Sequence, residues 1–243
     1  MAELIMRLAG DGLEALVQPA FWSCGSEVCP LARAAGSLGT GAALLLAAAV
    51  LIAAYLLGNI SPATLIARAR GIDIKTAGSG NAGTTNAARV LGGRAAVATL
   101  VIDIGKGALA VLLGRLLGGE LLAMAAVLPV MLGHIWPVFL RFRGGKGVAT
   151  AFGALVMLCP AVGLGDLALV AIGLLISRRM SVGSLVGCAA NPILAWIFLP
   201  HFTIDALLMS LIVLGKHSAN IRRLVRGEEP PFRLGGHRES NKE

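Results

Sequence analysis

A polar, glycine-rich stretch, Gly78–Asn86, lies between two strongly apolar segments of the chain. Glycine lets backbone N–H groups approach a bound anion, and Ser, Thr and Asn add short side-chain donors. An arginine three residues further on can bind a phosphate group through two nitrogen atoms. We therefore predict a phosphate-binding loop formed by Ser79, Gly80, Asn81, Gly83, Thr84, Asn86 and Arg89. The simpler alternative is a flexible linker in which Gly and Asn only make turns.

A second loop places one lysine among three glycines, directly before an apolar segment that starts at residue 148. Bare backbone N–H groups, an ammonium and a helix N-terminus with about half a unit of positive charge would together attract an anion. The excess of Lys and Arg that is usual in cytoplasmic loops of membrane proteins explains the neighbouring arginines of this loop. It does not explain the three glycines. The predicted binding residues are Gly144, Gly145, Lys146 and Gly147.

A third loop follows the last apolar segment and contains His217 and Asn220. Their spacing of three puts both side chains on one face of a helix, so they can share a pocket. A histidine there can act as a general base or donate to an anion. Between two earlier segments, Ser181 is predicted to contact a ligand and Ser184 to cap a helix.

Three of the ionisable residues within the apolar segments are candidates for chemistry. Asp103 and Lys106 are three residues apart on one predicted helix face, and His134 precedes Trp136-Pro137 near the end of the next segment. Charges at membrane depth are costly, which favours a functional interpretation. Lys106 and His134 are therefore candidate substrate-binding residues. A structural ion pair and an interfacial histidine are the alternatives.

Composition indicates which elements must carry these residues. The chain is 56% hydrophobic and 14% charged, with a net charge of +8, and its mean hydropathy is +0.81. Soluble domains contain roughly 25% charged residues, so we expect an integral membrane protein of the all-α class. Seven helical spans are predicted at residues 41–60, 95–117, 121–140, 148–162, 164–177, 184–199 and 203–215.

The distribution of Lys and Arg predicts the orientation of these spans. Basic residues gather in the loops after the first, third, fifth and seventh spans, while the opposite loops hold Glu120, Asp166 and Asp205. The positive-inside rule then places the three chemistry-bearing loops in the cytoplasm and the N-terminus outside. Residues 1–40 form a predicted extracytoplasmic extension in which Cys24 and Cys29 could pair in an oxidising compartment. Residues 41–227 form the membrane domain and 228–243 a polar cytoplasmic tail.

The loops, taken together and in order, resemble the bacterial acyl-phosphate:glycerol-3-phosphate acyltransferases of the PlsY type. The resemblance covers about residues 44–230. It rests on Gly78–Asn86 with Arg89, Asp103-x-x-Lys106-Gly107, Gly133-His134-x-x-Pro137 through Gly147, Ser181-x-x-Ser184, and Lys216-His217-x-x-Asn220-Ile221-x-Arg223-Leu224 with Gly227 and Glu229. The chain departs from the family at Ser218-Ala219, where Arg-Glu is usual, and in its N-terminal extension.

The resemblance implies a seven-helix inner-membrane enzyme that makes 1-acyl-glycerol-3-phosphate, the first acylation of phospholipid synthesis. Its substrates would be acyl phosphate and sn-glycerol 3-phosphate, with no cofactor or metal. The enzyme that supplies acyl phosphate is a candidate partner. The implied catalytic residues are Ser79, Asn81, Lys146, His217 and Asn220. The hydroxyl proton would pass either to the acyl phosphate's own oxygen or to His217.

Two other classes of function fit the sequence less well. A transporter of a phosphorylated solute would have helices broken near the midplane and often two matching halves, but the glycine-rich motifs lie in loops and the chain has no evident internal repeat. A membrane-anchored nucleic-acid binder would need aromatic stacking platforms, and aromatic residues make up 5% of the chain.

Overall fold

The computed structural model describes residues 39–232, and these residues fold into helices and loops without a strand. This confirms the all-α prediction for the described part of the chain. Cys24, Cys29, nearly all of the predicted extension and the end of the tail lie outside the described residues. The elements are α3 (Thr40–Gly58), α4 (Pro62–Ala69), α5 (Thr84–Val90), α6 (Gly93–Ile135), η1 (Val138–Leu140), α7 (Val148–Leu158), α8 (Pro160–Ser177), α9 (Met180–Phe198), η2 (Pro200–Phe202), α10 (Thr203–Lys216) and α11 (Ser218–Val225).

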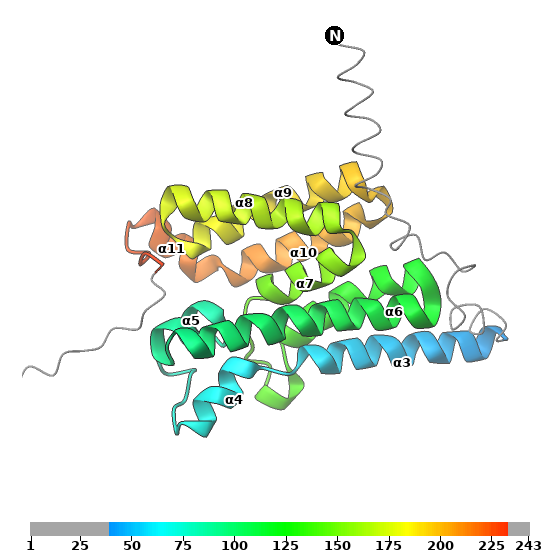
Figure 1. The fold of residues 1–243 in the computed structure, drawn as a ribbon, viewed down its shortest axis with the longest axis horizontal. Coiled ribbons are helices and arrows are strands. Elements are labelled where there is room, and N and C mark those ends of the chain that lie inside the picture. Colours follow the sequence, from blue (N-terminus) through cyan, green and yellow to red (C-terminus); the bar gives the residue numbers. More distant parts are fainter. Residues whose placement is uncertain (1–38, 233–243) are drawn as a thin grey trace, which may run out of the picture.

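Helices α8, α9 and α10 form one group and α3 and α6 another, with α7 between them (Figure 1). Helix α7 packs against both α6 and α8. The short helices α4, α5 and α11 all lie at the left end of this view, together with the loops that contain the predicted phosphate-binding residues (Figure 1). The helices therefore bring the three loops to one end of the bundle.

Among the described residues, four helices are long and apolar enough to cross a membrane, namely α3, α6 with its continuation to Leu140, α8 and α9. A fifth results if η2–α10 and α11, which are bent by 60° at their junction, are counted as one span. By this criterion of length and composition, residues 39–232 contain four or five candidate spans where the sequence predicts seven. Helix α7, with 11 residues, is about 16 Å long and is shorter than a bilayer's hydrocarbon core.

Helix α6 is a hairpin of two arms. Gly118 and Gly119 have non-helical backbone angles, and Gly119 has a φ of 72°, which glycine adopts at little cost. Lys106 Nζ lies 2.8 Å from His134 Nδ1, although 28 residues separate them. In a continuous helix the two residues would be about 42 Å apart. The arms 93–117 and 120–135 thus correspond to the predicted second and third helices.

The third predicted helix ends earlier than expected. Its arm stops at Ile135, and Pro137 is followed by a short 3-10 turn rather than by helix up to residue 140. A proline disfavours helical geometry in the residue before it, so the chain leaves the helix at Trp136. This brings the backbone of His134 and Ile135 next to the glycine-lysine loop.

The break predicted between the fourth and fifth spans, at residue 163, is wrong, and so is the placing of Asp166 in a loop there. Only Cys159, in extended conformation, separates α7 from α8, and Pro160 is the first residue of α8. Proline is favoured at that position because its missing N–H has no helical partner there. Asp166 therefore lies inside α8 and is buried, not in a loop.

The capping role predicted for Ser184 is also wrong. Helix α9 begins at Met180, four residues earlier than expected, and Ser184 Oγ donates a hydrogen bond to the Met180 carbonyl at 3.0 Å. This is the back-bonding that serine makes inside helices. Ser181 instead occupies the first turn of α9.

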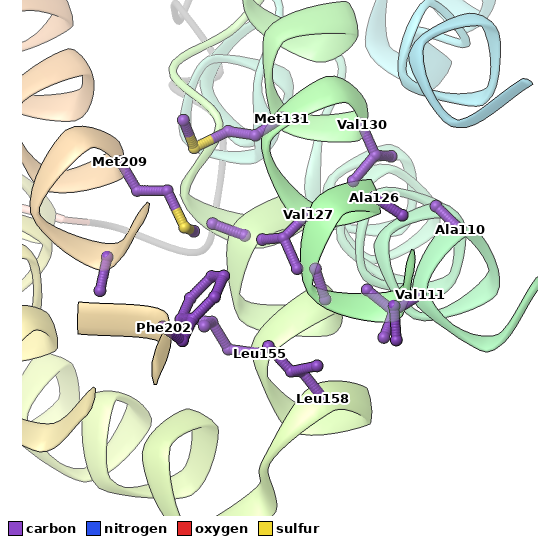
Figure 2. Packing of buried hydrophobic residues seen from close by; sticks show 14 of the residues in the cluster. Ala110, Val111, Ala126, Val127, Val130, Met131, Leu155, Leu158, Phe202 and Met209 are labelled. Carbon is purple, nitrogen blue, oxygen red and sulfur yellow. The ribbon is translucent and has the colours of Figure 1, made fainter. Parts of the chain in front are cut away.

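The hydrophobic core lies between the second arm of α6, α7, η2 and α10. Figure 2 shows Val127 and Met131 of α6, Leu155 of α7, Phe202 of η2 and Met209 of α10 around one region. Elsewhere small residues let the backbones touch. A Cβ atom on Gly58 of α3 or on Gly133 of α6 would overlap backbone atoms of the other helix. Such close approach is the usual way in which membrane helices pack.

Candidate active site

A cavity of about 420 Å³ extends from the loop end of the bundle into the space between the helices. Its loop end is polar and cationic, and its walls between the helices include Leu100, Phe152, Leu155, Val170 and Leu174. Twelve of the sequence-predicted residues line it, namely Ser79, Asn81, Gly83, Thr84, Asn86, Arg89, His134, Lys146, Gly147, Ser181, His217 and Asn220. The fold thus brings together residues from three loops that are far apart in sequence.

The first loop is held in shape by Asn86, the third residue of α5. Its Oδ1 accepts the backbone N–H of Ser79 at 2.8 Å, and its Nδ2 donates to the carbonyls of Ile74 and Ala77 at 3.4 and 3.0 Å. Asn86 is 1% exposed, and both its amide hydrogens are used inside the protein. In this structure Asn86 shapes the loop and has no donor left for a phosphate.

Other members of this loop remain available to a ligand. Thr84 Oγ1 is buried and has no hydrogen-bond partner among the described residues, yet Thr84 lines the cavity. Arg89, also on α5, lines the cavity without a hydrogen bond or ion pair to another described residue. Gly80 does not line the cavity. It makes a turn, with a φ of 67° and its N–H donated to Ala77.

Lys75 connects the first loop to the glycine-lysine loop. Its Nζ donates to the Gly144 carbonyl at 3.0 Å, which fixes two loops that are 69 residues apart. Burial and the positive charge of Lys216 lower the pKa of Lys75 to about 8. No role in the site was predicted for Lys75 from the sequence. It was counted only among the basic residues that set the orientation in the membrane.

The glycine-lysine loop does not offer its first two backbone N–H groups to a ligand, contrary to the prediction. Gly144 donates to the Ile135 carbonyl and Gly145 to the His134 carbonyl, each at 3.1 Å. Neither glycine lines the cavity. Their lack of a side chain allows close packing, because a Cβ on Gly145 would overlap the His134 ring. Lys146 and Gly147 do line the cavity, and Gly147 directly precedes the first residue of α7.

Lys146 is at the centre of a charged network. Its Nζ donates to Asn220 Oδ1, while Asn220 Nδ2 donates to Glu229 Oε1 at 2.6 Å. Arg223 Nε donates to the other oxygen of Glu229 at 2.7 Å. Glu229 therefore orients the Asn220 amide so that its oxygen points at the lysine. Glu229 is part of the family motif in the sequence, but its place in the cavity was not predicted.

Burial dominates the electrostatics of this network. It lowers the pKa of Lys146 to about 8, helped by the positive charges of Arg223 and Arg89 and opposed by Glu229. Burial alone would raise the pKa of Glu229, but hydrogen bonds from Asn220 and Arg223 bring it below its ordinary value. At neutral pH the site therefore contains an ammonium beside a carboxylate.

The imidazole ring of His217 is uncharged in this site. Its Nδ1 lies 2.8 Å from the Val213 carbonyl, and since a carbonyl only accepts, Nδ1 carries the proton. Nε2 is then the acceptor nitrogen. Burial and the charge of Lys146 lower the pKa of His217 to about 4, against the Val213 carbonyl and Glu229. The residue can accept a hydrogen bond at neutral pH, but it is a weak base.

Asp103, Lys106 and His134 form a buried cluster that joins three helical segments. Lys106 Nζ lies 2.8 Å from Asp103 Oδ1 and 2.8 Å from His134 Nδ1. It also donates to the carbonyls of Gly58 and Ile60, at 3.0 and 2.6 Å. Lys106 does not line the cavity, whereas Asp103 and His134 do. This geometry favours the structural ion pair over substrate binding by Lys106.

Within residues 39–232, no group of three or more His, Cys, Asp or Glu side chains could hold a metal ion. Cys159, between α7 and α8, and Cys188 of α9 are free thiols. The polar end of the cavity instead presents ammonium, guanidinium, amide and hydroxyl donors. Such a donor set suits phosphate oxygens.

Comparison with known proteins identifies the family. The sequence profile of the family "Glycerol-3-phosphate acyltransferase" matches residues 48–227. The glycerol-3-phosphate acyltransferase of Shewanella loihica is 40% identical over 187 residues, covering 76% of this chain and 92% of that protein. That of Clostridioides difficile is 43% identical over 188 residues, covering 74% and 92%.

Solved structures agree with the sequence relatives. The crystal structure of PlsY (YgiH), an integral membrane glycerol 3-phosphate acyltransferase, superposes in its glycerol 3-phosphate form with a TM-score of 0.74 and 32% identity, covering 77% of this chain and 96% of that chain. Its lysophosphatidic acid form gives a TM-score of 0.71. These matches confirm the family resemblance seen in the loops. The chain is a membrane protein that belongs to the glycerol-3-phosphate acyltransferase family.

Proposed function

We propose that this enzyme transfers a fatty acyl group from an acyl phosphate to the 1-hydroxyl of sn-glycerol 3-phosphate. The products are 1-acyl-glycerol-3-phosphate and inorganic phosphate, in the first acylation of phospholipid synthesis. The observation that carries the proposal is a single cavity that is cationic at the loops and apolar between the helices. An acyl phosphate has the same division into an anionic head and an apolar tail. The forms in which the PlsY relative was solved are named for glycerol 3-phosphate and lysophosphatidic acid.

Each substrate brings a phosphate, and the cavity offers two cationic side chains for them. In the proposal Arg89 and Lys146 bind the phosphates, assisted by the donors of Ser79, Asn81 and Thr84. The N-terminus of α7, which begins just after Gly147, lies at the cavity and adds positive potential. Asn220 holds Lys146 in place, and Ser181 lies beside Glu229. This family assignment favours acyl transfer over transport of a phosphorylated solute.

The chemistry requires no nucleophilic side chain, because an acyl phosphate is already activated. The glycerol hydroxyl oxygen attacks the acyl carbon, and the bond from that carbon to the phosphate oxygen breaks. The hydroxyl proton passes to the departing phosphate. His217 accepts a hydrogen bond from the hydroxyl at Nε2 and orients it, since a group with a pKa of about 4 is a poor proton acceptor. Donors of the loops stabilise the oxyanion.

We place the protein in the bacterial inner membrane with its site facing the cytoplasm. Counting both arms of α6 together with α3, α7, α8, α9 and α10 gives seven membrane segments, of which α7 is a short one. The loops at the site carry a surplus of Lys and Arg, which supports a cytoplasmic position. The phosphorylated substrates are cytoplasmic metabolites in this proposal, and the enzyme that supplies acyl phosphate is a candidate partner.

Release of inorganic phosphate by the purified full-length protein in lipid tests this proposal. Palmitoyl phosphate and glycerol 3-phosphate together should release phosphate and form the lysophospholipid, whereas palmitoyl-CoA should not replace the acyl phosphate. Lys146→Ala should abolish the release. Arg68→Ala is the matched control, because Arg68 is an exposed cation of α4 that does not line the cavity. Equal losses in both variants, or release that ignores glycerol 3-phosphate, would contradict the proposal.

A further inference from the structure

The deep part of the cavity is not uniformly apolar. Asp166 of α8, Asn191 of α9 and Ser210 of α10 line it, although all three belong to candidate membrane segments. They are 8%, 5% and 4% exposed, respectively. None of the loops that hold the proposed reacting groups contributes to this cluster. We call Asp166, Asn191 and Ser210 the deep polar cluster.

Contacts between the three helices place these residues close together. The Asp166 carbonyl faces Gly187, one turn before Asn191 on α9. Asn191 Nδ2 donates to the Ala206 carbonyl at 3.3 Å, one turn before Ser210 on α10. The Cys188 thiol, which also lines the cavity, donates to the Ser210 carbonyl at 3.0 Å.

Hydrogen-bonding capacity remains unused in this cluster. Asp166 Oδ1, Asn191 Oδ1 and Ser210 Oγ are all buried and have no hydrogen-bond partner among the described residues. Buried polar groups without partners are rare because each has lost its hydrogen bonds to water without gaining others. Polar side chains at membrane depth are correspondingly uncommon and are by default functional. Three such atoms on one cavity wall point to a ligand group that satisfies them.

The position of the cluster identifies which part of the ligand would reach it. Asp166 and Asn191 are each eleven residues from the helix end nearest the loops, and Ser210 is six residues from it. At 1.5 Å per residue the cluster is about 9–16 Å from that end. The proposed acyl tail extends through this region. The middle carbons of the chain, and not its carboxyl end, would therefore lie beside the cluster.

We propose that the deep polar cluster binds a hydroxyl group on the acyl chain, so that mid-chain hydroxylated acyl phosphates are preferred donors. A hydroxyl can donate to Asn191 Oδ1 or Asp166 and accept from Ser210. A plain hydrocarbon chain would leave these groups unpaired, and sites that are built to bind a hydroxyl discriminate against substrates that lack it. The inference rests on the proposed acyl-phosphate activity.

The test uses the full-length protein in lipid and stearoyl phosphates with one hydroxyl at successive carbons, with plain stearoyl phosphate as reference. The expected result is a window of mid-chain positions in which kcat/KM exceeds that of the plain substrate roughly three- to tenfold, the effect of one or two hydrogen bonds. In Asn191→Leu and Asp166→Leu the ratio of hydroxylated to plain substrate should fall to about one. Ser210→Ala, a milder change, should reduce it partly.

Leu167→Ala is the matched control, because it alters the same wall without removing a polar group. It should keep the ratio. The ratio is independent of how much of a variant folds, since both substrates meet the same active fraction. A wild-type ratio at or below one at every position would overturn the inference, as would a sharp chain-length limit without a hydroxyl preference. If the wild type does not turn over plain stearoyl phosphate at all, the proposed function would be overturned instead.

Discussion

The ammonium of Lys146 donates to the amide oxygen of Asn220, 74 residues further along the chain. This contact joins the loop before α7 to helix α11, at the loop end of the cavity. Asn220 cannot turn its amide around without losing its bond to Glu229 Oε1. The lysine is therefore held by an acceptor whose orientation a carboxylate fixes. The electrostatic behaviour of this lysine is open to direct measurement.

The pH dependence of kcat/KM should show an alkaline limb near pH 8. The pKa of Lys146 is lowered to about 8, so the free enzyme carries the ammonium below that pH and loses it above. Lys146→Arg should lower activity but remove the limb, because guanidinium stays charged. In the wild type the limb of kcat should lie at higher pH than that of kcat/KM, since bound phosphate favours the ammonium. An unshifted limb in Lys146→Arg would contradict the assignment.

His217 should leave no titration of its own in the neutral range. With a pKa of about 4, its ring stays neutral between about pH 5.5 and 7.5, where an ordinary histidine titrates. At saturating substrate, kcat should be flat over this range. His217→Ala should retain turnover within about tenfold, the value of one oriented hydrogen bond. A loss of several hundredfold would instead identify His217 as the proton acceptor.

Variants of Arg89 and Asn86 should have different effects, the first on substrate binding and the second on the stability of the first loop. Arg89→Ala removes a cavity side chain without a protein partner and should raise KM at least tenfold, with a change in stability within about 0.5 kcal/mol. Asn86→Ala breaks three hydrogen bonds and should lower the unfolding free energy by about 1–3 kcal/mol. Steady-state kinetics and thermal unfolding in the same detergent distinguish the two. Equal effects of both variants on stability would contradict this division.

The Asp103–Lys106 pair should behave as a structural unit. Lys106→Met leaves a buried carboxylate without its cation and should destabilise the protein by about 3–5 kcal/mol. The double variant Asp103→Leu with Lys106→Met should recover much of that loss, because it removes both charges. Thermal unfolding of the two single variants and the double variant gives the coupling. Additive losses would show that the residues do not act as a pair.

Local patterns predicted the site best where the partners lie on one element. The spacing of three between Asp103 and Lys106 is enough to put both side chains on one face of α6. His217 and Asn220 have the same spacing, but His217 lies at the junction between α10 and α11 and only Asn220 is inside a helix, although both line the cavity. The contact of His134 with Lys106 depends on how the two arms of α6 pair, and no local pattern encodes that register. The N–H groups of Gly144 and Gly145 were misassigned for the same reason, because their partners, the carbonyls of Ile135 and His134, come from another segment.

The predicted helix boundaries were wrong where a glycine can indicate either a turn or a close contact between helices. Around Asp166 the residues Pro160, Gly163 and Gly165 suggested a turn, as they would in a soluble protein. In the structure Gly163 lies inside α8, where a Cβ would overlap the backbone of Val156 in α7. Glycine there is a packing residue, and proline begins a helix. Asp166 was therefore placed at a membrane surface rather than beside the cavity.

Glu229 has a practical consequence for how the catalytic unit is delimited. The family profile ends at residue 227, two residues before the carboxylate that binds Asn220 and Arg223. Three residues later, the Phe232 N–H donates to the Arg178 carbonyl at the end of α8. An expression fragment that ends at residue 227 would keep every helix found between residues 39 and 232 yet leave Asn220 free to rotate. The smallest active fragment should therefore extend at least through Phe232.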